Sequence, residues 1–326
     1  MKILVAGGAG YLGSVLIPKL LERGYCADVV ELFWFGNHLP GEVGILNKDI
    51  FDLSVEDLRA YEQVIFLAGL SNDPMAEFSP SKNFIFNAAA PAYLAYISKR
   101  ALVRRFIYAS SCSVYGYTEN ELYDETRPAV SSYPYGISKL QGEQAAMQLV
   151  SREFSVISLR QGTVSGFSPR MRLDLVINTM FRTALKDRTI TVNNPHIWRP
   201  ILDIEDAANA YIRAVEADQS ISGIFNVASG NHTVGEIADL VKMTVEQELR
   251  LKIGLTIRHN QDFRNYKVSI VKAENILSFH PHGDVRSIAL NLIENMAKFN
   301  DWDNPAYYNI EILKKLEAQS VGKAVV

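Results

Sequence analysis

The chain has 326 residues, of which 48% are hydrophobic and 21% are charged, and its formal net charge at pH 7 is −3. Such a chain can bury a large core, and its ordinary glycine, proline and charge content excludes disordered, collagen-like and coiled-coil classes. The weak negative charge gives no electrostatic reason to expect nucleic acid, and no apolar run reaches the length of a membrane span. We therefore predict a globular protein with neither a nucleic-acid nor a membrane partner.

The two cysteines, Cys26 and Cys112, are too few for a disulfide framework. They indicate a reducing compartment, and we predict a cytoplasmic protein. The six histidines are scattered along the chain, and no segment has the spacing of metal ligands, so no metal site is predicted.

The first half of the chain alternates short β-branched runs with amphipathic stretches. The predicted strands are Lys2–Ala6, Ala27–Glu31, Ile45–Asp49, Gln63–Leu67, Arg105–Ser110 and Ser155–Arg160. The predicted helices are Tyr11–Arg23, Ser54–Ala60, Ser81–Ala101 and Pro134–Arg152, and Pro91 should kink or break the third of them. This alternation predicts an α/β fold, a Rossmann-like, doubly wound parallel sheet with helices on both faces.

After Gly166 the pattern is less regular. We predict helices at Leu173–Lys186, Glu205–Ala217, Thr233–Leu249, Asp284–Lys298 and Tyr307–Ala318, and a strand at Gly223–Val227. No long linker separates the halves, so they should pack directly on each other. The predicted units are a cofactor-binding domain of residues 1–165, to which residues 201–228 return, and a smaller mixed substrate-binding domain in the remainder of residues 166–326.

A glycine-rich turn follows the first predicted strand and opens the first predicted helix. Its glycines, Gly7, Gly10 and Gly13, permit a tight turn, close approach of the backbone to a pyrophosphate, and close packing of helix on strand. The helix N-terminus directs N–H groups and the positive end of its dipole toward the phosphates. A turn without a ligand is the alternative, but the strand before it and the helix after it favour a dinucleotide site.

An acidic residue, Glu31, ends the second predicted strand. A carboxylate there can accept hydrogen bonds from ribose hydroxyls and would repel a 2′-phosphate. No arginine occurs between Glu31 and Lys48, so this segment lacks the cation that a 2′-phosphate needs. We therefore predict NAD rather than NADP. Asp49 ends the third predicted strand and is either an acceptor for the adenine amino group or a plain loop residue.

Tyr135 and Lys139 lie one turn apart on the same face of a predicted helix. An ammonium held beside a phenol favours the phenolate, which makes tyrosine a usable base near neutral pH. Such a pair arises easily by chance in a chain with 15 tyrosines, so its meaning depends on its surroundings. Tyr133 is a rival for the base, but the residue four positions after it is Ile137, and Tyr135 is the better candidate.

Hydroxyl groups gather at the carboxyl end of the fifth predicted strand, in the segment Tyr108-Ala-Ser-Ser111-Cys-Ser-Val-Tyr115-Gly. Open α/β sheets place their chemistry at this edge. A hydroxyl there can bind the substrate oxygen that Tyr135 deprotonates and hold it in line with the nicotinamide.

Together these motifs resemble the extended short-chain dehydrogenase/reductase family, in its nucleotide-sugar epimerase/dehydratase branch. The matching segments occur in family order and cover nearly the whole chain: Gly7–Gly13, Glu31, Asp49, Leu67–Gly69, Asn87, Ser110–Gly116, Tyr135–Lys139, Arg160–Gly166 and Arg199–Asp203. The resemblance implies that Ser111, Tyr135 and Lys139 are catalytic. Tyr135 would act as base and acid, while Lys139 would lower its pKa and hold the nicotinamide ribose.

The resemblance also implies two sets of binding residues. NAD would contact Gly7, Gly10, Tyr11, Leu12, Gly13, Glu31, Asp49, Ile50, Leu67, Ala68, Gly69, Asn87, Tyr135 and Lys139. A nucleotide-diphosphate sugar would contact Ser71, Ser111, Cys112, Thr163, Arg172, Asn178, Arg199 and Arg264. Guanidinium groups match phosphate oxygens well, although surface salt bridges are the alternative role for these arginines. Family members commonly dimerise through helices like Ser81–Ala101 and Pro134–Arg152, which implies a homodimer.

The implied activity is that of a nucleotide-sugar 4-epimerase, in which Tyr135 deprotonates the C4 hydroxyl and NAD takes and returns the C4 hydride. A 4-dehydrogenase or 4-ketoreductase with net redox change stays open, because Thr163 lies where many members have Asn. A 4,6-dehydratase is less favoured, since Cys112 and Ser113 occupy the positions of its Asp-Glu pair. Cys112 is then either a proton-transfer group or a small buried thiol. A non-catalytic NAD-sensing protein is a different class, which the retained catalytic residues disfavour.

Overall fold

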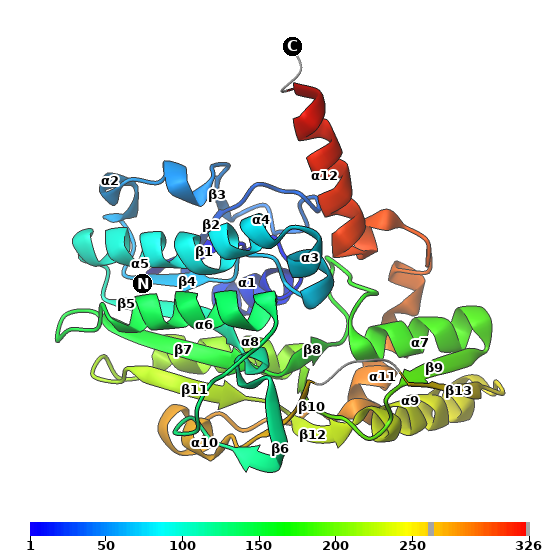
Figure 1. The fold of residues 1–326 in the computed structure, drawn as a ribbon. Coiled ribbons are helices and arrows are strands. Elements are labelled where there is room, and N and C mark those ends of the chain that lie inside the picture. The colour runs from blue at the N-terminus through cyan, green and yellow to red at the C-terminus, as the bar shows by residue number, and fades with distance from the viewer. Residues whose placement is uncertain (260–263, 324–326) are drawn as a thin grey trace.

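The centre of the molecule is a sheet of seven parallel strands (Figure 1). The structure, a computed structural model, describes residues 1–259 and 264–323. The strand order is β11-β7-β5-β4-β1-β2-β3. The strands are β1 (Lys2–Ala6), β2 (Cys26–Val30), β3 (Gly44–Leu46), β4 (Gln63–Phe66), β5 (Arg105–Ser111), β7 (Ser155–Gln161) and β11 (Gly223–Val227). The order reverses between β1 and β4, which opens a crevice at the carboxyl ends of these strands. The predicted doubly wound α/β fold is confirmed.

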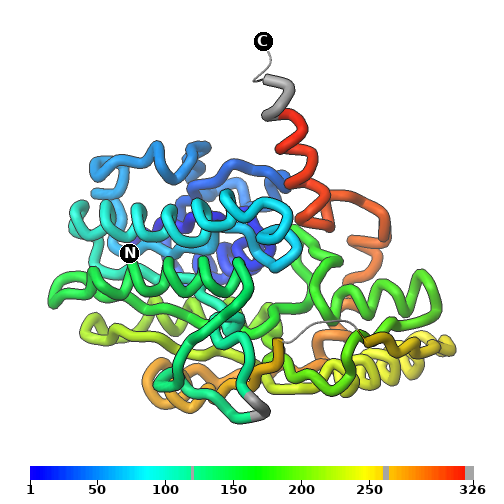
Figure 2. Tube along the Cα trace, in the orientation of Figure 1, coloured from blue at the N-terminus to red at the C-terminus, as the bar shows by residue number. Residues whose placement is uncertain are grey.

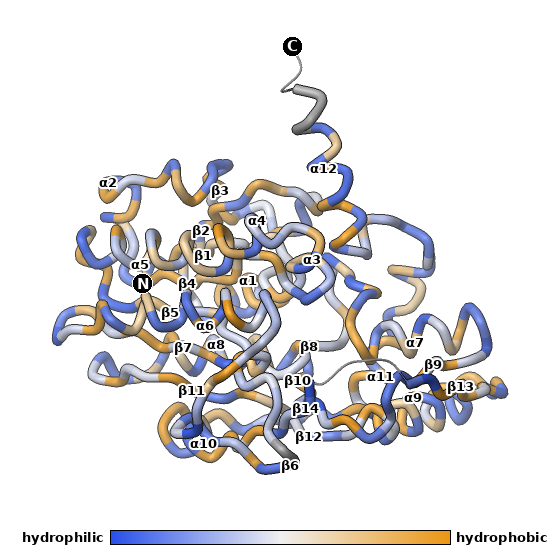
Figure 3. Tube along the Cα trace, viewed as in Figure 1, coloured by the Kyte–Doolittle hydropathy of each residue, from blue (hydrophilic) through white to orange (hydrophobic). Residues whose placement is uncertain are grey.

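Helices cover both faces of this sheet because its strands are apolar on both faces. Ile3 and Val5 of β1 face one core, while Leu4 and Ala6 face the other, and all four are fully buried. The first core is closed by α1 (Gly13–Glu22), α8 (Ile204–Glu216) and α10 (Val271–Leu277). The second core is closed by α2 (Val55–Leu58), α5 (Ala90–Arg100) and α6 (Pro134–Met147). Figure 3 shows hydrophobic residues concentrated along the central strands.

The helix predicted across Pro91 is interrupted. It consists of α4 (Pro80–Phe84), a π-helical turn and α5. A proline lacks the N–H that would bind the carbonyl four residues earlier, which here is that of Asn87. That carbonyl instead accepts a hydrogen bond from the Tyr108 hydroxyl at 3.0 Å. A strand of the sheet thus satisfies the group that the proline leaves without a partner.

The second half of the chain forms a lobe around its own core. The helices α7 (Val176–Asp187), α9 (Val234–Leu249) and α11 (Val285–Asn295) surround this core, in which Phe181 and Phe299 are in contact. Three small sheets border it: β12-β10-β8, β13-β9 and β14-β6. Their strands are β6 (Tyr117–Tyr123), β8 (Thr163–Ser165), β9 (Thr189–Asn193), β10 (Trp198–Asp203), β12 (Gly230–Thr233), β13 (Gly254–Arg258) and β14 (Asn265–Val268). None of these strands is among the predicted elements.

The chain returns from this lobe to the large sheet. β11 pairs with β7 in parallel, as Figure 2 shows by the neighbouring green and yellow-green tubes, and α8 packs on α1. The buried Arg105 of β5 fixes this return, because its guanidinium donates to the carbonyls of Ala214, Ala217 and Asp218 at the end of α8. On this basis we propose the division into residues 1–165 with 201–228, and the remainder of 166–326.

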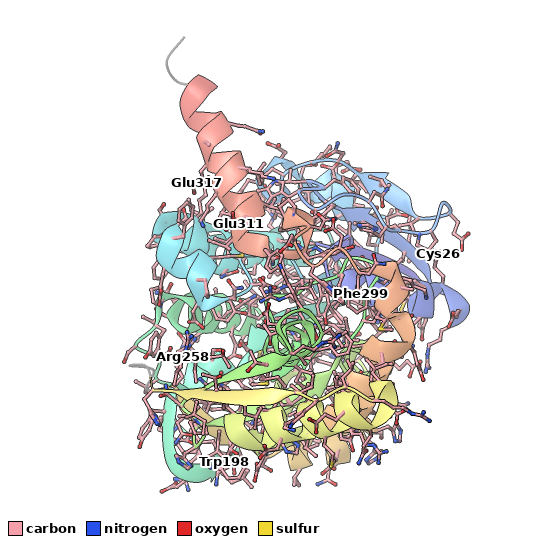
Figure 4. The ribbon with its side chains drawn as sticks, turned by 90° about the vertical axis from the view of Figure 1, so that its right-hand side faces the viewer. Cys26, Trp198, Arg258, Phe299, Glu311 and Glu317 are labelled. Atoms are coloured by element: carbon pink, nitrogen blue, oxygen red, sulfur yellow. The ribbon has the colours of Figure 1, made fainter. Side chains whose placement is uncertain are left out.

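The last helix, α12 (Asn309–Lys323), begins against the short helix α3 (Asp73–Phe78) and then leaves the body of the molecule (Figure 1). Figure 4 shows Glu311 and Glu317 along it, at the end of the molecule opposite Trp198. The remaining helical turns are Ile50–Asp52, Ile85–Ala89, Cys112–Tyr115, Met296–Lys298 and Pro305–Tyr307. Across residues 1–259 and 264–323, no helix has the length and apolar character needed to cross a membrane. In the same ranges no cluster of His, Cys, Asp and Glu could hold a metal ion.

A buried carboxylate at the start of α8 should make stability depend on pH. Asp203 caps this helix by accepting from the Glu205 N–H at 2.7 Å. Burial, with the nearby Asp206, Glu205 and Asp284 carboxylates, raises the pKa of Asp203 to about 6, from 3.8. Because the folded pKa is the higher one, this group's contribution to stability is complete below pH 3.8 and is lost as the pH rises through 6.

We expect Asp203→Asn, which keeps the cap and removes the charge, to be more stable than the wild type at pH 7.5. The gain should be on the order of 1–3 kcal/mol and should disappear near pH 4. Urea unfolding at both pH values measures it. Asp218→Asn is the control, because hydrogen bonds from Ser220 lower the pKa of that exposed carboxyl and its effect should have the opposite sign. A less stable Asp203→Asn protein at pH 7.5 would contradict the prediction.

Candidate active site

A cavity of about 660 Å³ opens at the carboxyl ends of β1, β4 and β5, and both halves of the chain form its walls. It collects most of the predicted site residues: Gly7, Gly10, Tyr11, Leu12, Gly13, Glu31, Asp49, Ile50, Leu67, Ala68, Gly69, Ser71, Ser111, Tyr135, Lys139, Thr163, Arg172, Arg199 and Arg264. Asn87, Cys112 and Asn178 are fully buried and do not line it. The cavity is large enough for a cofactor and part of a substrate.

The glycine turn forms one end of the cavity, and its backbone leaves no room for side chains. Gly7 has φ +80°, and a Cβ there would lie 2.5 Å from the Ala68 nitrogen. A Cβ at Gly13 would lie 2.2 Å from the Gly8 carbonyl oxygen. Among the described residues, no side chain caps the N-terminus of α1. The turn therefore brings bare backbone and an uncapped helix end to the cavity, as binding of a pyrophosphate requires.

Replacing Gly13 by alanine should push the Gly8 backbone out of this turn. We expect at least tenfold weaker NAD binding and a clear loss of stability, because backbone atoms cannot yield as a flexible side chain can. The matched control is Gly41→Ala, since a Cβ on Gly41 would have no described atom within 4 Å and the φ there is unstrained. That variant should stay within about 0.5 kcal/mol of the wild type. Calorimetric NAD titration and thermal unfolding of both variants test this, and equal NAD affinities would contradict it.

Glu31 follows β2 and faces the glycine turn. Its carboxylate accepts from the N–H groups of Ala9 at 3.3 Å, Leu32 at 3.0 Å and Phe33 at 3.3 Å. Burial raises its pKa, which these backbone hydrogen bonds partly offset. Asp49 accepts from the Phe51 N–H at 2.9 Å and caps a helical turn, while still lining the cavity. The acceptor that the sequence predicts for the adenosine ribose thus lies next to the turn that would hold the phosphates.

The candidate catalytic side chains meet in the middle of the cavity. Ser111 ends β5, where its hydroxyl accepts from the Ser113 N–H at 3.2 Å and is close enough to the Tyr135 phenol to lower the pKa of that phenol. Lys139 lies one turn after Tyr135 on α6, with Nζ 5.9 Å from the centre of the Tyr135 ring and 3.0 Å from the Ala109 carbonyl oxygen, to which it donates. The predicted serine, tyrosine and lysine therefore share one site.

The pKa values of Tyr135 and Lys139 differ from what the sequence predicts. Burial raises the pKa of the Tyr135 phenol above its ordinary value, and the Asp73 carboxylate adds to this rise, while the Ser111 hydrogen bond and Arg172 oppose it. Burial also lowers the pKa of the Lys139 ammonium to about 8. Lys139 is thus protonated at neutral pH but directs its charge to a carbonyl. These side chains alone do not lower the phenol pKa in the way the sequence predicts.

Three of the predicted residues lie behind the cavity wall. Asn87 donates to the Leu70 carbonyl at 2.9 Å and so holds the loop after β4. Asn178 accepts from the Gly166 N–H at 3.0 Å and donates to the Tyr11 hydroxyl at 3.1 Å, which joins the two halves of the chain.

Cys112 also lies behind the wall. It is 1% exposed and directs its thiol to the Arg160 carbonyl at 3.2 Å. Burial raises the pKa of this thiol, which supports a packing role rather than proton transfer.

The cations on the substrate side are held by neighbouring groups. Arg172 forms a two-point ion pair with Asp174, with N–O distances of 2.8 and 3.0 Å. Arg264 is paired with Asp73. Arg199 donates to the carbonyls of Trp198 and Arg264, so the two arginines lie side by side.

Sequence reasoning missed several residues that line the same cavity, among them Asp73, Arg170, Tyr266 and Asn309. Tyr266, at 5.4 Å from the Arg199 guanidinium, follows Arg264 closely in the chain, and Arg170 precedes Arg172. Proximity to predicted residues was therefore the available signal for these two. Asn309 carries no such signal, because it starts the last helix and reaches the cavity only through the fold.

The family model for the NAD dependent epimerase/dehydratase family matches residues 3–228 of this chain. The chain belongs to this family. As a family member it is an NAD-dependent enzyme, and its resemblance to the extended short-chain dehydrogenases/reductases is confirmed. The residues present fit NAD, because the glycine turn, the carboxylate of Glu31 and the Ser111-Tyr135-Lys139 group follow one another along the cavity.

Several relatives of this family member carry an assigned activity. A UDP-glucose 4-epimerase of Corynebacterium glutamicum is 25% identical over 309 residues, covering 88% of this chain and 93% of its own. UDP-glucuronic acid decarboxylase 6 of Arabidopsis thaliana is 26% identical over 309 residues, covering 88% and 86%. The crystal structure of a UDP-glucuronic acid 4-epimerase from Bacillus cereus, with UDP-glucuronic acid and NAD, has a TM-score of 0.80 at 21% identity and covers 91% of this chain and 99% of that one. This last likeness shows the fold.

Proposed function

We propose that this protein is a nucleotide-sugar 4-epimerase that works through a transient 4-keto sugar. The observation that carries the proposal is that Ser111, Tyr135 and Lys139 line one cavity together with the glycine turn and the arginines of the second lobe. A hydride-transfer site needs its cofactor and substrate next to each other, with the acid-base group within reach of the substrate oxygen. The relatives that act on UDP-sugars support this substrate class.

The residues divide the reaction between them. NAD held by the glycine turn and Glu31 would supply the hydride acceptor and donor for C4 of the sugar. Tyr135 removes the proton from the C4 hydroxyl and returns it when the ring has turned. Ser111 donates a hydrogen bond to the oxygen that becomes a carbonyl. Lys139 holds the ribose beside the nicotinamide and places a positive charge near the phenolate that forms.

The diphosphate of the sugar nucleotide would lie among Arg172, Arg199 and Arg264. Two of these are already paired with carboxylates, which keeps each guanidinium in a defined position. Thr163 and Ser71 also line this region of the cavity and would contact the substrate. Thr163 has a short hydroxyl where many family members have an amide, so the contact it offers the sugar is different.

The test is a substrate panel. Purified protein is incubated with UDP-glucose, UDP-galactose, UDP-glucuronic acid and UDP-N-acetylglucosamine, and products are separated while absorbance at the reduced-nicotinamide band is followed. Interconversion of C4 epimers without net reduction of NAD supports the epimerase. Stoichiometric formation or use of reduced NAD identifies a 4-dehydrogenase or 4-ketoreductase, and loss of carbon dioxide identifies a decarboxylase. Either result replaces the proposal.

We further propose a homodimer built on α5 and α6. Tyr96 of α5 is 49% exposed, and Ile85 in the turn before it is 45% exposed, so this face presents apolar surface. Sedimentation velocity gives the mass in solution, and a monomer at micromolar concentration would refute the proposal. Both cysteines are unpaired, with Cys26 on the outer edge of the molecule in Figure 4, and this supports the cytoplasm as location.

A further inference from the structure

Four arginines of this protein are buried almost completely: Arg105, Arg160, Arg170 and Arg172 are between 1% and 5% exposed. A buried guanidinium is costly unless hydrogen bonds or a carboxylate compensate its charge. Three of the four are compensated. Arg160 is paired with Glu143, Arg172 is paired with Asp174, and Arg105 donates to several carbonyl oxygens at the end of α8.

Arg170 is the exception among the described residues. Its partners there are all neutral: Nη2 donates to the side-chain oxygen of Asn309, and Nη1 makes a long 3.4 Å contact with the Met171 carbonyl. Nε has no partner within the described part of the chain. The guanidinium carbon lies over the Phe35 ring, 3.8 Å from its centre, and no described carboxylate forms a salt bridge with the guanidinium. Burial, together with the nearby charge of Arg172, lowers the pKa of Arg170 to about 9, and the Asp174 and Glu31 carboxylates offset this only in part.

The position of Arg170 indicates which ligand supplies the missing charge. It lines the cavity on the side of the second lobe. Its guanidinium contacts Phe35, in the loop that follows Glu31, and its charge acts on Glu31 and on Tyr11 of the glycine turn. Of the substrate-side cations, Arg199 and Arg264 are held by a separate set of partners, Trp198 and Asp73, whereas Arg172 and its partner Asp174 lie near Arg170. An anion bound between the glycine turn and Arg170 therefore belongs to the cofactor.

We propose that Arg170 binds the diphosphate of NAD, facing the glycine turn across the cavity. The turn offers backbone N–H groups and a helix end, and Arg170 adds a full positive charge on the opposite side. Asn309 is a positioning residue in this arrangement. It holds Arg170 through its side-chain oxygen and donates from its side-chain nitrogen to the Ser71 hydroxyl at 2.7 Å.

Through the contact between Asn309 and Arg170, the last helix of the molecule would take part in cofactor binding. Leu313, on the next turn of α12, is buried against Leu70 and Met75 and fixes the helix on the loop after β4. Lys82 and Glu317 form an ion pair farther along the same contact. The start of α12 is therefore held firmly enough to keep Asn309, and with it the Arg170 guanidinium, in one place.

The test measures binding to the full chain after removal of any bound nucleotide. NAD, ADP-ribose, adenosine, NADP and UDP are titrated into the wild type, Arg170→Gln and Arg170→Lys by calorimetry. Hydrogen bonds to charged groups are strong enough that Arg170→Gln should weaken ADP-ribose and NAD by about 10- to 100-fold. The affinities of Arg170→Lys for ADP-ribose and NAD should fall between those of the wild type and Arg170→Gln. Adenosine, which has no phosphate, should bind all three proteins equally. Arg59→Gln on the exposed surface is the control and should change nothing.

Other outcomes overturn the proposal. ADP-ribose affinity within twofold of the wild type would show that Arg170 does not contact the diphosphate. A loss of affinity for UDP alone would show that Arg170 binds the substrate. A loss of affinity for NADP alone would show that it binds a 2′-phosphate. If Arg170→Gln does not fold, Asn309→Ala takes its place, and we expect severalfold weaker ADP-ribose binding with unchanged adenosine binding. Unchanged ADP-ribose affinity in that variant also refutes the proposal. These titrations need no turnover, so the result is independent of whether the proposed epimerase activity is found.

Discussion

Replacement of Tyr135 by phenylalanine should lower kcat by about 10²- to 10⁴-fold, the range that positioned acid-base groups contribute. Tyr135 is the phenol that lies against the Ser111 hydroxyl and within 5.9 Å of the Lys139 ammonium. Burial raises its pKa, so removal of the C4 proton needs positive charge beside the phenol, which Lys139 and a bound NAD would supply. Phenylalanine fills the same space and leaves the NAD contacts of the glycine turn in place.

Tyr133→Phe is the matched control for this change. Tyr133 precedes the helix, and its ring lies 5.2 Å from the Arg264 guanidinium, a contact that phenylalanine preserves. Its kcat should stay within about fivefold of the wild type. Turnover of the active sugar nucleotide and the amount of bound NAD are measured for both variants. A Tyr135→Phe protein that keeps more than a tenth of the wild-type kcat would remove Tyr135 from the catalytic role.

Replacement of Glu143 by glutamine should destabilise the protein by about 3–5 kcal/mol, because it leaves a buried guanidinium without its counter-charge. Glu143 of α6 is fully buried and accepts from Arg160 Nη2 at 2.6 Å and from the Ser158 hydroxyl at 3.0 Å. Arg160 also donates to the Tyr115 hydroxyl at 2.8 Å, which in turn donates to Asn226 of β11. Glutamine has nearly the same shape, so the loss measures the charge.

Two further variants define this effect. Glu56→Gln breaks an ion pair with Arg59 whose side chains are 80% and 57% exposed, and it should change stability by less than about 0.5 kcal/mol. The double variant Glu143→Leu with Arg160→Met removes both charges and should recover much of the loss. Urea unfolding at pH 7.5 measures all three. A Glu143→Gln protein as stable as the Glu56→Gln protein would show that the buried pair contributes no net stability.

The parts of the fold that the sequence predicts are those that local pattern determines. The strands of the large sheet read as continuous apolar runs because both faces are buried, and the glycines of the first turn are required by backbone contacts. β12 (Gly230–Thr233) has no such pattern, because all its residues are only partly buried and it pairs along one edge with β10. Short strands of this kind depend on tertiary contacts that the sequence does not display.

The candidate site also has parts that the sequence predicts and parts that it does not. Tyr135 and Lys139 share a helix face, so their spacing predicts their proximity. Asn309 and Ser71 are 238 positions apart and meet only because α12 packs on the loop after β4. The pKa of Tyr135 also depends on burial and on Asp73, which comes from another part of the chain. Charge environment is a property of the assembled cavity, and residue spacing alone does not give its sign.

The return of the chain to β11 determines which fragments of this protein can be produced in folded form. A fragment ending at residue 165 would contain the glycine turn and all three candidate catalytic residues, yet it would lack the strand that covers β7. The exposed edge would present the unpaired backbone N–H and C=O groups of β7 to other chains, and such edges recruit further strands. Arg105 would at the same time lose the carbonyls of α8. Such a fragment should collect in inclusion bodies, whereas one extended through residue 228 retains its own edge protection.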